Sequence, residues 1–243
     1  MTDNAPQLPL LYQNITPISA ERHGGYGLSA ERSYAFAAET GIAPLTIEEF
    51  TAAQRFFPIV FTREAPATPV ALFGPERNRN DFVGEDGAWR DGVYKPAYLR
   101  RYPFTFVRRS AESEERVLCA DMTSSHLEDG VEDEARALFK DGAAGKAGET
   151  AMEFCKAYEL ATARTQKALA ELEERELFRE GAIQVKIGDK TARIDGFRII
   201  DETRLRELDD AFLARLARTG ALGAIYAHLF SLANFSDLGG EAG

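Results

Sequence analysis

Apolar positions in the first half of the chain occur in short runs, each bounded by proline, glycine or charged residues. Brief apolar or β-branched runs of this kind are typical of short strands. Between two of these runs, Thr46 is followed three residues later by Glu49, a capping-box spacing that predicts a short helix. The predicted strands are residues 10–15, 58–61, 69–73, 105–107 and 117–120.

The second half is predicted to be mainly helical and to begin with one long helix. From residue 149 to about residue 178, an apolar stripe recurs every three or four positions, and polar side chains occupy the opposite side. This spacing predicts an amphipathic helix. The positions on the stripe are Met152, Cys155, Tyr158, Ala161, Thr165, Ala168, Leu169 and Leu172.

The hydrophobic period then changes from a helical value to two. Ile183, Val185 and Ile187 alternate with polar residues, a turn is expected at 188–190, and a second run follows at 191–194. Alternation on both sides of a turn predicts a β-hairpin.

Start and stop signals mark the remaining elements. A strand is predicted over residues 197–200, and Asp201 can cap the helix that follows it. Asp209 or the next residue begins another helix, which is expected to end near Gly220. The last helix is predicted over residues 222–235.

These patterns together predict an α+β fold, with a β-rich N-terminal half of short strands and a helical C-terminal half that contains an inserted β-hairpin. A chain of 243 residues that is 44% hydrophobic can bury one substantial core or two small ones. Because we find no repeat and no clear linker, we expect a single domain over residues 1–238. Residues 239–243 are expected to fray as a C-terminal tail.

The charge balance argues against a nucleic-acid-binding role. The formal net charge is −10 and the pI is near 5.0, whereas nucleic-acid binders present a basic face. The one locally basic stretch, at residues 90–109, is followed by acidic residues that extend to Glu134. This asymmetry suits a charged partner, but a solvated face that keeps the protein soluble is the favoured explanation.

The compartment is expected to be the cytoplasm. The N-terminus lacks the basic start and apolar stretch of a secretory signal, and no window has the roughly 20 apolar residues of a membrane span. Cys119 and Cys155 have no CxxC spacing, so neither a zinc site nor a disulfide framework is indicated. Both lie in apolar patterns and are expected to be core residues in a reducing compartment.

The segment from Asp86 to Arg109 carries the most distinctive chemistry, because it places six cationic residues among tryptophan, tyrosine and phenylalanine side chains. Aromatic faces beside guanidinium groups can bind flat or anionic groups. The alternative is that the rings are buried and the arginines pair with acidic neighbours. If the segment is a strand, Arg100 and Arg101 point to opposite faces, so that at most one of them enters a pocket. The candidate ligand-binding residues are Trp89, Tyr94, Tyr98, Arg100, Arg101 and Tyr102.

The remaining polar motifs give weaker support for catalysis. His228 and Ser231 share a helix face, but no nucleophile elbow or orienting acid accompanies them, so a histidine that lines the polar edge of the helix is favoured. Asp121, His126 and His228 would form an enzyme site only if folding brought them together. The glycine-rich run at 23–27 matches neither a P-loop nor a dinucleotide fingerprint. We therefore predict no catalytic residues, no metal site and no cofactor.

Several segments, taken in order, resemble the SapC family of bacterial proteins. The most specific is the run Tyr94-Lys-Pro-Ala-Tyr-Leu-Arg-Arg-Tyr-Pro-Phe104, preceded by Trp89. The resemblance extends from about residue 13 to residue 238. The other segments are residues 57–61, 70–74, 138–142, 196–202 and 220–232.

The resemblance implies a link to surface-layer systems, after which the family is named, and to outer-membrane receptor loci that also encode halogenase-like and JmjC-like proteins. It implies an accessory role by association and supplies no catalytic residues. A peptide-transport permease that shares the short name is a different protein, since this chain lacks a membrane span.

We therefore predict a cytoplasmic, non-catalytic accessory protein that binds a peptide, a protein or a small ligand linked to such systems. The alternative is an enzyme, possibly metal-dependent, that modifies a peptide or small molecule. A third possibility is a structural subunit that forms an oligomer through the last helix.

Overall fold

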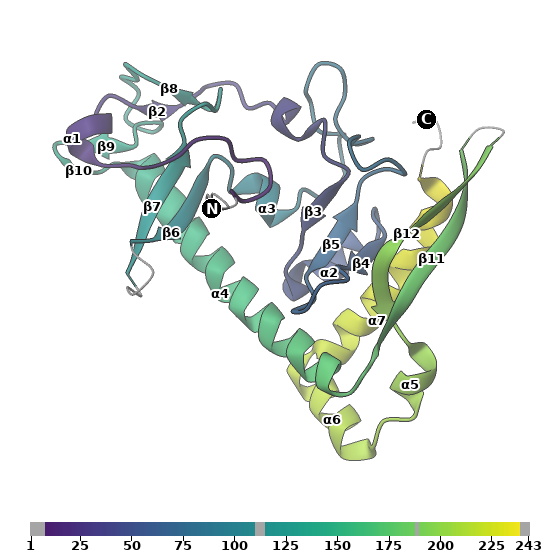
Figure 1. The fold of residues 1–243 in the computed structure, drawn as a ribbon. Helices are drawn as coiled ribbons and strands as arrows, with labels where there is room; N and C mark the ends of the chain where they lie inside the picture. The colour runs from purple at the N-terminus through teal and green to yellow at the C-terminus, as the bar shows by residue number, and fades with distance from the viewer. Residues whose placement is uncertain (1–7, 110–114, 188–189, 239–243) are drawn as a thin grey trace, which may run out of the picture. The chain divides into compact units, whose positions relative to one another are not determined.

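The computed structural model describes residues 8–109, 115–187 and 190–238 (Figure 1). Contacts within the chain gather in two compact units, each built from two stretches of sequence. Unit 1 comprises the residues up to Phe36 together with Arg100–Ala157. Unit 2 comprises Ala37–Leu99 and the residues from Tyr158 onward. The long helix α4, Lys146–Glu174, begins in unit 1 and ends in unit 2.

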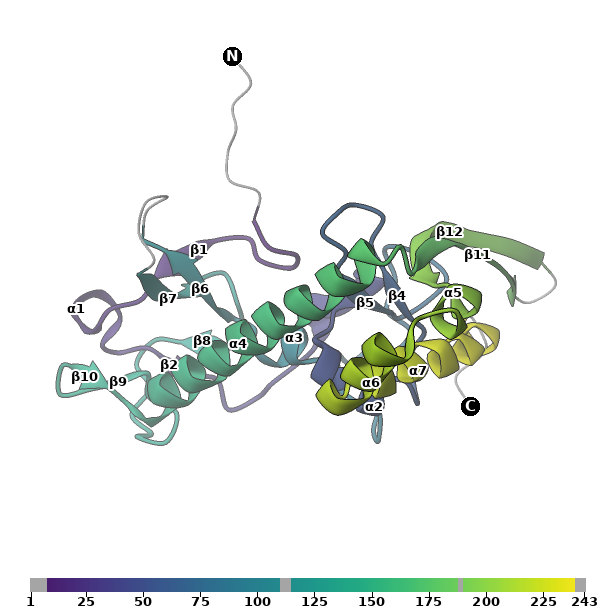
Figure 2. The same cartoon turned by 90° about the horizontal axis from the view of Figure 1, so that it is seen from below.

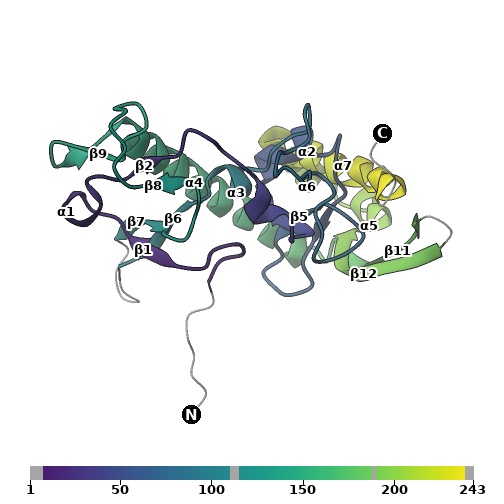
Figure 3. The ribbon, with the colours of Figure 1, turned by 90° about the horizontal axis from the view of Figure 1, so that it is seen from above.

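Unit 1 is built on a three-stranded antiparallel sheet in the order β1-β7-β6. These strands lie side by side in Figure 3. Phe104, Leu118 and Ala120 of this sheet pack with Ala151 and Cys155 of α4, and the two form one hydrophobic core. The elements of the unit are β1 (Ile15–Pro17), α1 (Ala20–His23), β2 (Gly27–Leu28), β6 (Phe104–Arg108), β7 (Arg116–Asp121), β8 (Leu127–Glu128), β9 (Phe139–Lys140) and β10 (Ala143–Ala144).

Unit 2 contains a five-stranded antiparallel sheet in the order β11-β12-β4-β5-β3. Its core combines Val60, Val70 and Phe197 from the strands with Phe235 and Leu238 from the C-terminal segment. The strands are β3 (Ile42–Pro44), β4 (Ile59–Phe61), β5 (Pro69–Leu72), β11 (Phe178–Ile187) and β12 (Lys190–Ile200).

Short helices accompany this sheet, and α2, α6 and α7 lie together in Figure 2. Two further helical segments, η1 (Ala35–Ala37) and α3 (Ala97–Arg100), lie where the chain passes between the units. The helices of unit 2 are η2 (Ile47–Glu49), α2 (Phe50–Ala53), α5 (Glu202–Arg206), α6 (Asp210–Thr219), α7 (Ala221–Ser231) and η3 (Leu232–Asp237).

The helix starts follow the predicted caps. Thr46 and Glu49 form the predicted capping box. The Asp201 carboxylate accepts hydrogen bonds from the first turn of α5, and the Asp209 carboxylate accepts one from Phe212 N–H in α6. Gly220 follows α6 with φ 79°, a left-handed conformation that glycine adopts without a Cβ penalty. The α+β prediction, with short strands first and helices later, is confirmed.

Two predicted strands differ from the observed ones. The run at residues 10–15 is not a strand, because the Asp121 carboxylate accepts the backbone N–H groups of Gln13 and Asn14, and β1 begins only at Ile15. The strand predicted over 197–200 is instead the end of a continuous β12. The register shifts opposite Gly181 and leaves Gly196, at φ 85°, as the extra residue of a β-bulge.

The hairpin is confirmed, although part of its turn, residues 188–189, lies outside the described residues, as does the predicted tail at 239–243. That residues 1–238 act as a single domain stays a prediction. In the part of the chain that the structure describes, no helix combines the length and the hydropathy needed to cross a membrane.

Candidate anion-binding site

The aromatic residues predicted for the site begin in the core of unit 2. Trp89 is 4% exposed, and its ring stacks on Phe82 and meets Phe57 and Phe73 edge-on. A β-bridge between Val83 and Trp89 fixes the backbone at this point. The structure therefore gives the Trp89 ring a packing role.

Tyr94 and Tyr98 hold the next part of the segment within unit 2. The Tyr94 hydroxyl and the Ala97 N–H both donate to Oε1 of the buried Glu49, at 3.0 and 2.7 Å. The other carboxylate oxygen of Glu49 accepts from the backbone and the hydroxyl of Thr46. Tyr98 is buried and meets Tyr158 edge-on. One buried carboxylate thus links the start of η2 to the start of α3.

Arg100, Arg101 and Tyr102 belong to unit 1, where all three line a pocket of about 290 Å³. The expectation that the two arginines point to opposite faces of a strand is wrong. The chain is helical up to Arg100 and then turns before β6, so both side chains reach the same pocket. We call it the arginine pocket; it is lined by Leu28, Arg32, Tyr34, Arg100, Arg101, Tyr102, Phe104, His126, Ala147, Thr150, Ala151 and Phe154.

Aromatic rings hold two of the guanidinium groups in place. The Arg100 guanidinium lies over the Phe154 ring, 5.3 Å from its centre. The Arg101 guanidinium lies 5.7 Å from the centre of the Tyr12 ring, and the residue is only 7% exposed. Cation–π contacts of this kind reduce the freedom of a guanidinium group without neutralising its charge.

Tyr102 forms the aromatic wall of the pocket. Its ring stacks on Phe36 at 4.1 Å and meets Tyr12 edge-on at 5.3 Å. The ring of His126 lies edge-on to both Tyr102 and Phe36. Burial raises the pKa of the Tyr102 hydroxyl, and its hydrogen bond with Ser124 acts in the opposite direction.

The charged residues that line the pocket are all cationic. None of the lining residues is an aspartate or a glutamate. Burial raises the pKa of Tyr34, while the charges of Arg32 and Arg100 act to lower it, so both cations lie near its hydroxyl. Burial also raises the pKa of the Cys155 thiol to about 11, against the opposing charge of Arg101.

His126 is neutral at neutral pH. Burial lowers its pKa below the ordinary value, the Ser33 carbonyl acts to raise it, and the charge of Arg32 lowers it further. Its Nε2–H donates to the Ser33 carbonyl at 2.6 Å. A proton added to His126 would increase the positive charge of the pocket.

The family model of SapC matches residues 18–238, nearly the whole chain. The chain belongs to the SapC family. No curated protein and no solved structure matches it. The match covers both units, so the two together correspond to what the SapC family shares.

The residues proposed for a catalytic alternative in this SapC chain hold backbone groups instead. Burial acts to raise the pKa of Asp121, but hydrogen bonds from Gln13, Thr123 and Asn14 outweigh it and lower the pKa. His228 belongs to unit 2, whereas Asp121 and His126 belong to unit 1. Within the described ranges, no group of three or more histidine, cysteine, aspartate or glutamate side chains is arranged to hold a metal ion.

Both cysteines are buried within unit 1, as predicted from their apolar surroundings. Burial raises the pKa of the Cys119 thiol, as it does for Cys155. A protonated, buried thiol is a poor nucleophile, so the two cysteines of this SapC chain are structural.

Sequence reasoning missed part of the arginine pocket. Arg32 and Tyr34 lie in the segment before η1, about seventy residues before Arg100, and no local pattern connects them with it. Ala147 and Ala151, four residues apart on α4, form a small-residue face that leaves space beside the arginines. The spacing of these two alanines was the one feature of the sequence that could have indicated the pocket. Small residues at helical spacing, however, more often pack against a neighbouring element than line an open space.

Proposed function

We propose that this SapC-family protein is a non-catalytic accessory protein that binds an anionic group of a peptide or protein partner in the arginine pocket. The observation that carries the proposal is the convergence of Arg32, Arg100 and Arg101 on one pocket whose lining contains no carboxylate. Guanidinium groups bind carboxylates and phosphates through paired, charge-assisted hydrogen bonds.

The dimensions of the arginine pocket favour a terminal group over a whole cofactor. A volume of about 290 Å³ is at the small end for ligand sites, and it suits a carboxylate or phosphate group carried on a short side chain. Tyr34 and Tyr102 add hydroxyl groups and ring area, which a peptide can contact beside the anion.

The biological setting of the proposal comes from the family. The resemblance links SapC proteins to surface-layer and outer-membrane receptor systems, so we propose that the partner belongs to such a system and is met in the cytoplasm. Adapter proteins of this kind need a recognition pocket and no reactive group, which fits the structural roles of Asp121, Cys119 and Cys155.

The test uses a fluorescein-labelled hexaglutamate peptide, with inorganic phosphate as a competitor. An Arg32→Gln/Arg100→Gln variant removes the two exposed guanidinium charges of the pocket and leaves the buried Arg101 in place. We expect this variant to bind the peptide about tenfold more weakly by fluorescence anisotropy, with an unchanged melting temperature.

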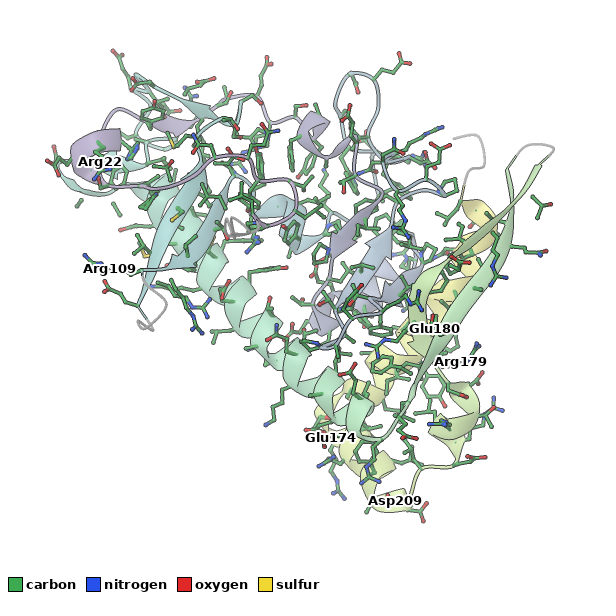
Figure 4. The ribbon with its side chains drawn as sticks, in the orientation of Figure 1. Arg22, Arg109, Glu174, Arg179, Glu180 and Asp209 are labelled. Carbon is green, nitrogen blue, oxygen red and sulfur yellow. The ribbon has the colours of Figure 1, made fainter. Side chains whose placement is uncertain are left out.

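The matched control is an Arg22→Gln/Arg109→Gln variant. Both arginines are exposed residues of unit 1 outside the pocket lining, and both are labelled in Figure 4. The control has the same net charge as the pocket variant, so equal losses in the two variants would mean that only overall charge matters and would overturn the site. A partner captured from cell extract by the wild type and the control, but not by the pocket variant, would identify the physiological ligand.

A further inference from the structure

A second and larger pocket lies entirely within unit 2, between η2, α2, the C-terminal half of α4, α6 and α7. Its volume is about 760 Å³, which lies within the range of roughly 300–1,000 Å³ that is typical of small-molecule sites. We call it the helix pocket. The α2, α6 and α7 ribbons that contribute to it can be followed in Figure 2.

The helix pocket is open because the face of α7 toward it carries small side chains. Ala221, Ala224 and Ala227 line it together with Gly223. A Cβ atom added at Gly223 would meet no heavy atom within 4 Å, so the packing places no requirement for glycine there. Glycine inside a helix costs roughly 1 kcal/mol relative to alanine, so the space beside it is retained at some expense of helix stability.

An aromatic side chain lies at the edge of this space. Phe230 lines the pocket and is 67% exposed, and its ring lies 6.0 Å from that of the exposed Tyr226, one turn earlier on α7. Two exposed aromatic rings beside an apolar space form a surface on which an apolar ligand can be buried.

Among the described residues, the charges on the α4 wall leave one cation without an ion-pair partner. Arg164 Nε pairs with Glu48 Oε1 at 2.6 Å, and Glu171 pairs with Arg215 at 3.1 Å. Lys167 lies between them on the same helix face, and no carboxylate of the described residues is within ion-pair distance of it. The neighbouring charges are thus neutralised in pairs, and, as far as the described residues go, the charge of Lys167 is left for a ligand.

We propose that the helix pocket binds a small monocarboxylate with an apolar body, with the carboxylate on Lys167 and the apolar body against α7 and Phe230. A single uncompensated cation beside an apolar space matches one anionic head group and a hydrocarbon or aromatic body. This site is independent of the proposed function, because the arginine pocket belongs to unit 1.

The experiment titrates decanoate, decanol and decylammonium into the wild-type protein by calorimetry. We expect decanoate to bind with one-to-one stoichiometry, and decanol and decylammonium to bind about tenfold more weakly or not at all. Lys167→Gln should weaken decanoate binding to the level of decanol. Lys156→Gln, an exposed lysine on the same helix outside the pocket, should leave it unchanged.

A second variant tests the space itself. Gly223→Leu fills the pocket at an exposed helical position and raises helix propensity, so the fold should be kept while decanoate binding is lost. Ala163→Leu, at an exposed α4 position outside the pocket, is its control and should bind normally. Decanoate binding that survives Gly223→Leu, or no binding to folded wild-type protein, would overturn the proposal. A wild-type dimer that Gly223→Leu converts to monomers would assign the pocket to a second copy of the chain instead.

Discussion

His228 shows how a single buried side chain can connect separate elements. Its Nδ1–H donates to the Ile59 carbonyl of β4 at 2.8 Å, and its Nε2 accepts from the Ile200 N–H of β12 at 3.1 Å. Ser231 extends the connection, because its hydroxyl accepts the Ile59 N–H and donates to the His228 carbonyl. The pair therefore satisfies backbone groups inside unit 2, which explains why two residues with hydrolase-like chemistry lie on one helix face.

The pH dependence of stability should report on His228. Burial lowers its pKa from 6.5 to about 4, whereas in the unfolded chain it binds a proton near 6.5. The unfolded state therefore holds more protons between pH 4 and 6.5. The free energy of unfolding should be at its full value above pH 6.5 and fall by about 3 kcal/mol as the pH drops to 4. Urea denaturation measured at several pH values checks this expectation.

The variant His228→Gln separates this effect from other groups. The pKa of His126 is also lowered, so this residue contributes to the pH dependence in the same direction. Asp121 and Asp209 have pKa values below the ordinary 3.8, so their contribution to the free energy of unfolding is lost only at pH values below 3.8. The slope of unfolding free energy against pH should become shallower in His228→Gln. An unchanged slope would show that the buried histidine does not control it.

Single residues were predictable where their partners are local. The Thr46–Glu49 capping box spans three residues and was evident in the sequence. The further bonds from Tyr94 and Ala97 to Glu49 join residues more than forty positions apart, and no local pattern encodes them. The same holds for the contact between His228 and Ile59, so the buried role of His228 was not evident.

Helix α6 depends on a cap that can be tested directly. The Asp209 carboxylate accepts the Phe212 N–H at 2.9 Å, and this backbone hydrogen bond lowers the pKa of Asp209. Asp209, labelled in Figure 4, also pairs with Arg175, but that pair is exposed. We expect Asp209→Ala to lower the free energy of unfolding by about 1 kcal/mol, and Asp209→Asn to retain most of it because asparagine also caps.

The control for this cap is Asp210→Ala, one residue later. Asp210 is the first residue of the same helix and accepts no cap bond, so its loss should cost only a few tenths of a kcal/mol. Equal losses at the two positions by thermal or urea denaturation would mean that helix-end charge, and not the hydrogen bond, stabilises α6.

Whole elements were predictable where the pattern was long or capped. The amphipathic period of α4, the alternation of the β11–β12 hairpin and the acidic caps of α5 and α6 each depend on residues near in sequence. Helix α3 was missed because its four residues are too few for a helical period to be recognised in the sequence. Because α3 was missed, Arg100 and Arg101 were expected on opposite faces of a strand, whereas both line the same pocket.

The net charge of −10 acts on every anion that approaches the molecule, whereas we propose that the arginine pocket attracts one locally. As the pH falls from 7.5 to 5.5, the molecule becomes less negative. Protonation of His126, whose pKa burial lowers, would add a positive charge beside Arg32, Arg100 and Arg101. Binding of the labelled hexaglutamate peptide should therefore tighten across this range at constant ionic strength. Anisotropy titrations at each pH measure the change.

In the variant His126→Asn, the pH dependence of peptide binding should be smaller, because only the change in overall charge remains. Its melting temperature must first show that the variant is folded. A pH dependence identical to that of the wild type would exclude His126 as the source. Weaker binding at low pH in the wild type would contradict the anion-binding role of the pocket.

At the scale of the whole chain, the candidate site was only partly predictable. The conspicuous segment at 86–109 crosses from unit 2 into unit 1 after Leu99, so the parts before and after that residue have different surroundings. Its chemistry could be identified in the sequence, but the division between the units depends on long-range packing. Of the six predicted residues, Arg100, Arg101 and Tyr102 line the same pocket. That the six bind one ligand stays a prediction.

The interleaved order of the two units restricts how the protein can be dissected. Any continuous fragment that contains all of unit 1 also carries residues 37–99, and any that contains all of unit 2 also carries residues 100–157. A stop codon or a protease cut at one position therefore cannot release either unit alone. Independent expression of unit 2 would require residues 37–99 to be fused to the segment that starts at Tyr158, with α4 cut at the junction. A premature stop between Tyr158 and Glu174 would remove most of the second part of unit 2 and also truncate the helix shared with unit 1.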